Sequence, residues 1–225
     1  MMNKQLWYQN LTLNGYNQPA NPVDMGECKV DAPDDQYILR MLIKRPNDQF
    51  KIPSQLKWIE HVVDTCYAVQ KSLNLANDRF VYVTVRNGIV KSTTDDMWHA
   101  DGFSMRVPHV PEQNYVWSNH TSTEWLDQTF EIPSDFDPLE HNIHQYFDDH
   151  AEQKNVKQMP VGSLTMIDPY CIHRRPKLQE GTNRKFFRIS FVPIEIEDDT
   201  CQQNPLLPTG PYNRDDIRKK LKRYV

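Results

Sequence analysis

The chain has 225 residues, of which 38% are hydrophobic and 11% aromatic, with a formal net charge of -4. This length and composition are typical of one folded domain with a sizeable core, and we expect a single domain over residues 1–225 with its core at about 79–196. The acidic balance argues against nucleic acids and anionic membranes as main partners, since both normally require a basic surface.

The four cysteines show no CxxC spacing, and no run of 18 apolar residues occurs. The first ten residues lack the apolar stretch of a secretory signal peptide. Free thiols in a reducing compartment are therefore expected, which places the protein in the cytoplasm and predicts no membrane span. The cysteines are Cys28, Cys66, Cys171 and Cys201.

The first half of the chain predicts a loop-rich lead-in, a strand, a long helix and a second strand. Gln36–Arg45 is the first strand. Pro53–Leu75 is the helix, because apolar residues recur at intervals of three and four and Pro53 suits a first turn. Arg79–Gly88 is rich in β-branched residues, and Asn87-Gly88 at its end is typical of a turn.

The second half is mostly strand-like, with one helical insertion. This order predicts an α+β domain built on a β-sandwich or barrel. The segments are a β-like run at 114–125, a helix at 137–153, strands within 160–176 and 183–196, and a short basic helix at 213–225.

The stretch DDMWHADGF places His99 and Asp101 two positions apart. In an extended strand, residues two apart project to the same face. An imidazole and a carboxylate on one face are either surface residues or two ligands of a metal ion. Non-haem Fe(II) oxygenases use two histidines and one carboxylate, which leave the opposite side of the metal open. Trp98 and Phe103 would wall such a site.

A third ligand must come from another part of the chain, and His173 is favoured. It follows a strand that begins at Gly162 and a break at Asp168-Pro169. A structural histidine before the Arg-Arg pair is the alternative reading. His109 lies too close along the chain to return easily to the site, and His120 stays possible. Three further histidines lie on the predicted helix, namely His141, His144 and His150.

The segment NRKFFRISF carries a second group of polar residues. Arg188 and Ser190 would share a strand face, and Arg184 joins that face if the strand begins early enough. A guanidinium and a hydroxyl provide the bonds that a buried carboxylate requires. Surface arginines are the alternative reading.

Together, HAD, the later histidine and RIS resemble the Fe(II)/2-oxoglutarate-dependent oxygenase superfamily. The matched stretch runs from about Met97 to Phe191. The resemblance implies a double-stranded β-helix, a jelly-roll or cupin-like barrel, with flanking N-terminal helices and a helical insertion.

The resemblance also implies the roles of individual residues. His99, Asp101 and His173 would bind Fe(II), and Arg188 with Ser190 would hold the far carboxylate of 2-oxoglutarate. Arg184 is the rival for that role. The residue for the metal-side carboxylate stays open among Tyr82, Thr84, Trp117 and Asn119.

The reaction implied by the resemblance consumes dioxygen and 2-oxoglutarate and releases succinate and carbon dioxide. Asp101 favours hydroxylation, because relatives that halogenate lack this carboxylate. A small molecule such as an amino acid or metabolite is the favoured substrate. The acidic segment 108–153 would form part of the pocket or a lid and suits a cationic or neutral polar substrate, although a solvated acidic surface is equally consistent.

Three alternatives remain. The same chemistry could oxidise a pyrimidine base in DNA or RNA, which would require base flipping. A cupin-like metal enzyme that does not use 2-oxoglutarate would explain the three ligands but leave Arg188 and Ser190 without a role. A non-catalytic binding module would usually lack a ligand, and none is missing in this sequence. The oligomeric state is not predicted.

Overall fold

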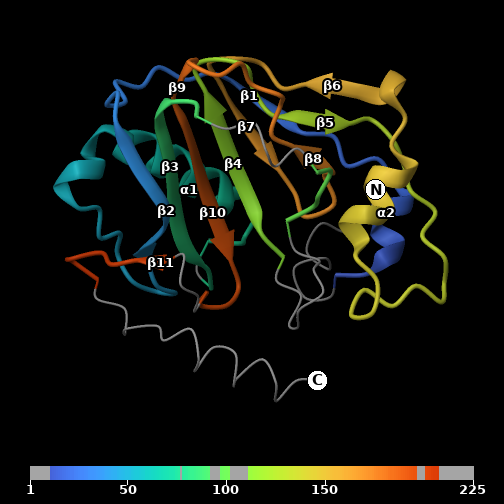
Figure 1. Ribbon diagram of the computed structural model, residues 1–225. Helices are drawn as coiled ribbons and strands as arrows, with labels where there is room; N and C mark the ends of the chain where they lie inside the picture. The colour runs from blue at the N-terminus through green and yellow to red at the C-terminus, as the bar shows by residue number, and fades with distance from the viewer. Residues whose placement is uncertain (1–10, 77, 92–96, 102–110, 197–200, 208–225) are drawn as a thin grey trace.

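The computed structural model describes residues 11–76, 78–91, 97–101, 111–196 and 201–207. Two β-sheets form the body of these residues, and a helical layer covers one side of the larger sheet (Figure 1). In spatial order the large sheet contains β1 (Val23–Glu27), β7 (Ser163–Ile167), β4 (Gln113–Ser118), β10 (Phe186–Val192), β3 (Phe80–Ile89), β2 (Gln36–Lys44) and β11 (Cys201–Gln202), with β9 (Asn183–Arg184) paired to β3. The small sheet contains β6 (Val156–Gln158), β5 (Glu124–Leu126) and β8 (His173–Arg174).

The chain alternates between the two sheets from β3 onwards. β3, β4, β7 and β10 are neighbours in the large sheet, and the intervening segments, His99, β5, β6 and β8, belong to the small one. His99 extends the small sheet by a bridge to His173 at the free side of β8. All of these strand pairs are antiparallel, and the parallel pair of β11 with β2 lies at the edge of the large sheet. Two sheets connected in this alternating way form a jelly roll. The predicted double-stranded β-helix is therefore confirmed.

Helices cover the outer face of the large sheet. The predicted helix Pro53–Leu75 is present as a 3-10 turn, η2 (Ser54–Ile59), followed by α1 (Glu60–Ser72). Val62, Val63 and Cys66 of α1 are buried against the sheet, as their spacing predicts. The remaining helical elements are η1 (Leu13–Asn17), α2 (Ile143–His150) and η3 (Gln153–Asn155).

The two faces of β10 differ in chemistry. Phe187, Ile189 and Phe191 point outward into the apolar core beneath α1 and η2. Arg188 and Ser190 alternate with them and therefore face the inside of the barrel. The same alternation on β3 and β4 gives the large sheet an apolar outer face and a largely polar inner face.

One predicted turn is wrong. Asn87-Gly88 does not end its strand, because β3 continues to Ile89 and pairs there with β9. The Asn87 side chain is buried, where its amide nitrogen donates to the Pro33 carbonyl and its oxygen accepts from the Phe186 amide. Asn87 therefore joins neighbouring segments to the sheet, and Gly88 supplies the backbone φ of 141° that follows it.

The predicted helix at 137–153 is shorter in the structure. It begins only at Ile143, because the Asn142 side chain accepts a hydrogen bond from the His144 amide and acts as the N-cap. Asp137 instead accepts from the Leu139 amide in a preceding turn. The expected basic helix at 213–225 lies outside the described residues, and no helix in the described ranges is long and apolar enough to span a membrane.

Phe187→Ala should remove much of the stability of the outer core. The Phe187 ring is fully buried and stacks on Trp117 at a centroid distance of 5.2 Å. We expect the free energy of unfolding in urea to fall by about 3–5 kcal/mol. Val161→Ala, at an exposed turn position, is the control and should change it by less than about 0.5 kcal/mol. Equal effects of the two substitutions would contradict this assignment of the core.

Candidate metal centre

His99 and His173 lie directly opposite each other across the small sheet. The His99 amide donates to the His173 carbonyl at 3.0 Å, and the His173 amide donates to the His99 carbonyl at 2.8 Å. The two imidazoles lie on the same face, with ring centroids 4.5 Å apart. Two backbone hydrogen bonds therefore bring together histidines that are 74 positions apart in the sequence.

Both imidazoles are held in the same tautomer by the backbone. Nδ1 of His99 lies 2.9 Å from the Met97 carbonyl, and Nδ1 of His173 lies 2.9 Å from the Cys171 carbonyl. A carbonyl can only accept, so each Nδ1 carries a proton, and Nε2 is the ring nitrogen left for another partner. Burial, with repulsion from His173, lowers the pKa of His99 to about 4, which keeps this imidazole neutral at pH 7.

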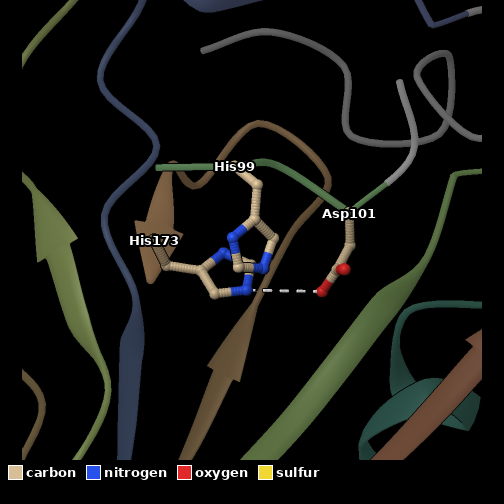
Figure 2. A group of neighbouring side chains, drawn as sticks. All are labelled: His99, Asp101 and His173. Atoms are coloured by element: carbon tan, nitrogen blue, oxygen red, sulfur yellow. Dashed lines mark ion pairs between the residues drawn. The ribbon is translucent and has the colours of Figure 1, made fainter. Parts of the chain in front are cut away.

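The carboxylate of Asp101 completes the cluster (Figure 2). One of its oxygens lies 3.4 Å from Nε2 of His173. One potential ligand atom from each of His99, Asp101 and His173 lies within 4.8 Å of the other two. The structure therefore brings together the three residues that the sequence predicts, although His99 forms a single bridge and Asp101 a bend rather than a continuous strand.

Asp101 is largely buried and yet held in its ionised form. Burial alone would raise its pKa, but the Arg188 guanidinium, followed by His173 and His99, holds the pKa well below its usual range. Nη1 of Arg188 lies 3.3 Å from one carboxylate oxygen and 3.2 Å from the other. A carboxylate that stays charged without water is suited to bind a cation.

Asn114 is a member of the cluster that the sequence did not single out. Its amide nitrogen donates to Asp101 at 2.6 Å, and its oxygen accepts from the Ser190 hydroxyl at 2.5 Å. Ser190 therefore reaches Asp101 through Asn114, whereas Arg188 contacts it directly. One sequence feature could have singled out Asn114. In the strand-like stretch QNYVWS it is an asparagine next to the apolar Tyr115, and asparagine is disfavoured inside a strand.

Arg184 lies in different surroundings. It pairs with Gly88 in β9, its Nε donates to the Thr121 carbonyl at 3.4 Å, and its guanidinium lies over the Phe186 ring. Burial lowers its pKa to about 10, together with repulsion from Arg175 and Arg86. The two predicted arginines thus have different charged neighbours, a carboxylate for Arg188 and two guanidiniums for Arg184.

The other candidate residues take various positions. His144 of α2 lies near the cluster, with its ring centroid 5.9 Å from that of His99. Trp98 is buried on the side of the segment away from the imidazoles, with Arg174 over its ring, so it does not wall the site. His120 bonds Thr121 at the surface. His109 and Phe103 lie outside the described residues. The other two histidines of the predicted helix contact aromatic rings: His141 lies against Phe136, and His150 lies against Tyr146.

The four residues considered for the metal-side carboxylate divide between the two faces. Tyr82 and Thr84 are cross-strand partners of Ser190 and Arg188, so they share the inner face with the cluster. Trp117 points into the outer core and bonds the Cys28 carbonyl. Asn119 accepts from the Lys185 amide at the end of β4.

Two buried polar atoms on the inner face have no hydrogen-bond partner among the described residues. They are Nε of Arg188 and Oγ1 of Thr165. Both residues are cross-strand partners of Val116, so they lie in one row on the same face of the sheet. Orphaned buried donors are costly, so a polar ligand is expected beside them.

No protein-family model matches the chain, and no curated protein matches it either. Several solved structures are weakly similar in shape. AviO1 from Streptomyces viridochromogenes is 12% identical with a TM-score of 0.42, over 88% of this chain and 96% of that one. EvdO2 from Micromonospora carbonacea var. aurantiaca, complexed with 2-oxoglutarate, is 13% identical with a TM-score of 0.35, over 69% and 70% of the two chains.

HygX from Streptomyces hygroscopicus, with nickel, 2-oxoglutarate and hygromycin B bound, is 10% identical with a TM-score of 0.33, over 59% of this chain and 65% of that one. Similarities this weak assign neither a family nor an activity to the chain.

Arg188→Met should destabilise the metal-free protein by leaving the Asp101 charge without its guanidinium. We expect the free energy of unfolding in urea at pH 7 to fall by about 2–4 kcal/mol. This is slightly less than the cost of removing one partner from a completely buried ion pair. Asp101→Asn in the same background should recover at least half of the loss, because the neutral amide needs no counter-charge.

The control is Lys157→Met, which breaks the exposed ion pair with Asp127 and should cost less than about 1 kcal/mol. If Asp101→Asn recovers nothing in the Arg188→Met background, the two residues are not coupled as the geometry indicates.

Proposed function

We propose that this protein is an Fe(II)- and 2-oxoglutarate-dependent oxygenase that hydroxylates a small molecule. The observation that carries the proposal is the convergence of two imidazoles and one ionised carboxylate beside a guanidinium inside a jelly roll. The comparisons supply none of this support. His99, Asp101 and His173 are the proposed metal ligands and catalytic residues.

The donor set fits a ferrous ion. Two imidazole nitrogens and one carboxylate are the ligands that non-haem Fe(II) enzymes use, and they leave positions open for other molecules. The Nδ1–H groups are fixed to backbone carbonyls, so both rings are oriented before a metal arrives. When bound, the iron would supply the oxidising chemistry with dioxygen and the oxo acid.

The charges of the site fit a dicarboxylate. A divalent metal, the Asp101 carboxylate and the Arg188 guanidinium together leave two positive charges in a buried space. 2-Oxoglutarate carries two negative charges and would neutralise them. A buried site with net positive charge strongly favours a negatively charged ligand, because little water is present to screen the attraction between them.

Arg188 is the proposed receptor for the far carboxylate of 2-oxoglutarate. Its Nη1 contacts Asp101, while its Nε is the buried donor without a partner among the described residues. Ser190, two positions along β10, shares the same face and is bound to Asn114. A guanidinium can therefore hold Asp101 and an incoming carboxylate at the same time, which an ammonium does less well.

The surrounding residues have supporting roles in this proposal. Asn114 and Arg188 orient Asp101 and keep it charged, and the two backbone carbonyls orient the imidazoles. The inner face of the barrel keeps bulk water away from the reacting groups. Because the carboxylate ligand is present, hydroxylation is proposed rather than halogenation.

Replacing either of two ligands should abolish turnover. We expect His99→Ala and Asp101→Ala to lose at least about a hundredfold in the Fe(II)-dependent conversion of 2-oxoglutarate to succinate, because each removes a third of the donor set. Succinate is measured anaerobically and in air with a panel of small metabolites. His120→Ala, a surface histidine, is the control and should keep wild-type activity.

Wild-type turnover in either ligand variant would remove the metal assignment. Binding of Fe(II) without any succinate would instead support a cupin-like metal enzyme that does not use the oxo acid.

The two arginines should differ in their effect on the cosubstrate. Arg188→Lys keeps a positive charge beside Asp101 but loses the planar fork, so we expect KM for 2-oxoglutarate to rise by about tenfold or more. Arg184→Lys is the matched variant and should change this KM by less than about threefold, because Arg184 has no carboxylate of the cluster as its neighbour. The opposite ranking would show that Arg184 is the receptor.

A further inference from the structure

A pocket separate from the candidate metal centre lies at the end of the barrel where β3 meets β9. Its volume is about 480 Å³, which is within the range of small-molecule sites. Cationic side chains dominate its lining among the described residues: Arg86, Lys91, Arg175 and Arg184, against the one carboxylate of Asp35. Tyr37, Ile89 and Leu178 add apolar surface.

The arginines of this pocket lie on the same side of the sheets as the candidate metal centre. Arg86 is two positions after Thr84, the cross-strand partner of Arg188, so it shares the inner face one step further along β3. Gly88, which pairs with Arg184, is two positions further still. Arg175 follows His173 by two positions. Two residues along a strand span about 7 Å, so the pocket begins about that far along β3 from Thr84, the cross-strand partner of Arg188.

Three guanidiniums gathered in one pocket repel one another. Keeping a charge on Arg184 costs the most free energy of the three, since Arg184 is only 7% exposed. Burial, and then repulsion from Arg175 and Arg86, lowers its pKa. A buried guanidinium is stabilised when an anion accepts its hydrogen bonds.

We propose that this pocket binds the anionic group of the substrate. The substrate is a small organic molecule with an apolar body and one oxyanion, such as a phosphate monoester, a sulfate monoester or a carboxylic acid. The oxyanion bonds Arg175, Arg184 and Arg86, and the apolar body lies against Tyr37 and Leu178. This inference rests on the proposed function, in which Arg188 holds the cosubstrate. A substrate anchored there and extending toward the ligands presents a carbon to the metal at a fixed distance from its anionic end.

The acidity of the segment 108–153 suggested a cationic or neutral polar substrate. The pocket lining argues for the opposite charge, because the arginines that form it come from β3, β9 and the residues after β8 rather than from that segment.

Phenyl phosphate is the probe that tests this proposal, with inorganic phosphate as the comparison. Each is titrated by calorimetry into the full-length protein, with and without Ni(II) and saturating 2-oxoglutarate. We expect phenyl phosphate to bind in both states and more tightly than inorganic phosphate, because the ring contacts Tyr37 and Leu178. Arg175→Gln and Arg86→Gln should each weaken it about tenfold.

Lys177→Gln is the matched control, since it removes an exposed cation two positions from Arg175 that does not line the pocket. Arg86 is exposed, so its variant tests the pocket without disturbing a buried residue. Displacement of phenyl phosphate by 2-oxoglutarate would overturn the proposal and assign the pocket to the cosubstrate. Equal affinity in wild type and both arginine variants would also overturn it.

Failure of the proposed function gives a different result in the same titrations. In that case Ni(II) and 2-oxoglutarate would produce no binding heat, whatever the behaviour of phenyl phosphate.

Discussion

The largely buried carboxylate of Asp101 determines how the interior of this barrel is arranged around the candidate metal centre. Removed from water, it would be protonated without help, and its charge is preserved by the guanidinium of Arg188 and the amide of Asn114. Those two residues come from β10 and β4, the central strands of the large sheet, whereas the imidazoles belong to the small sheet. The carboxylate thus connects the two sheets electrostatically at the place where the metal is proposed to bind.

The large sheet makes this arrangement possible by separating its two faces. The outer face beneath α1 and η2 is mostly apolar and packs into a large hydrophobic cluster. Gln113 is a polar exception on this face, and its amide oxygen accepts from Gln70 of α1. The inner face can therefore carry arginine, asparagine, serine and threonine side chains, which weaken a core but serve a polar ligand. The main apolar core and the proposed chemistry occupy opposite faces of the same strands, while the Arg188–Asp101 pair contributes to stability on the inner face.

Much of this could be read from the sequence, and the failures have physical causes. The strand of Arg188 and the helix over the sheet were predictable, because alternation and periodicity are local. Alternation also placed His99 and Asp101 on one face, whereas the expectation that His173 joins them came from the resemblance to an oxygenase superfamily. The stretch QNYVWS marks Asn114 as unusual for a strand, but its contacts with Asp101 and Ser190 depend on the register between β4 and β10, which no local pattern contains. The turn at Asn87-Gly88 was wrong because the amide of Asn87 finds partners in distant segments. The arginine pocket could not be predicted either, since Arg86, Arg175 and Arg184 meet only after β3, β8 and β9 are assembled.

The most direct test is a crystal structure of the protein grown anaerobically with Fe(II), using the anomalous scattering of iron to locate the ion. The account predicts one ion at about 2 Å from Nε2 of His99, Nε2 of His173 and an oxygen of Asp101, with Arg188 still in contact with that carboxylate. An iron bound elsewhere, or an imidazole of His173 turned away from Asp101, would contradict it.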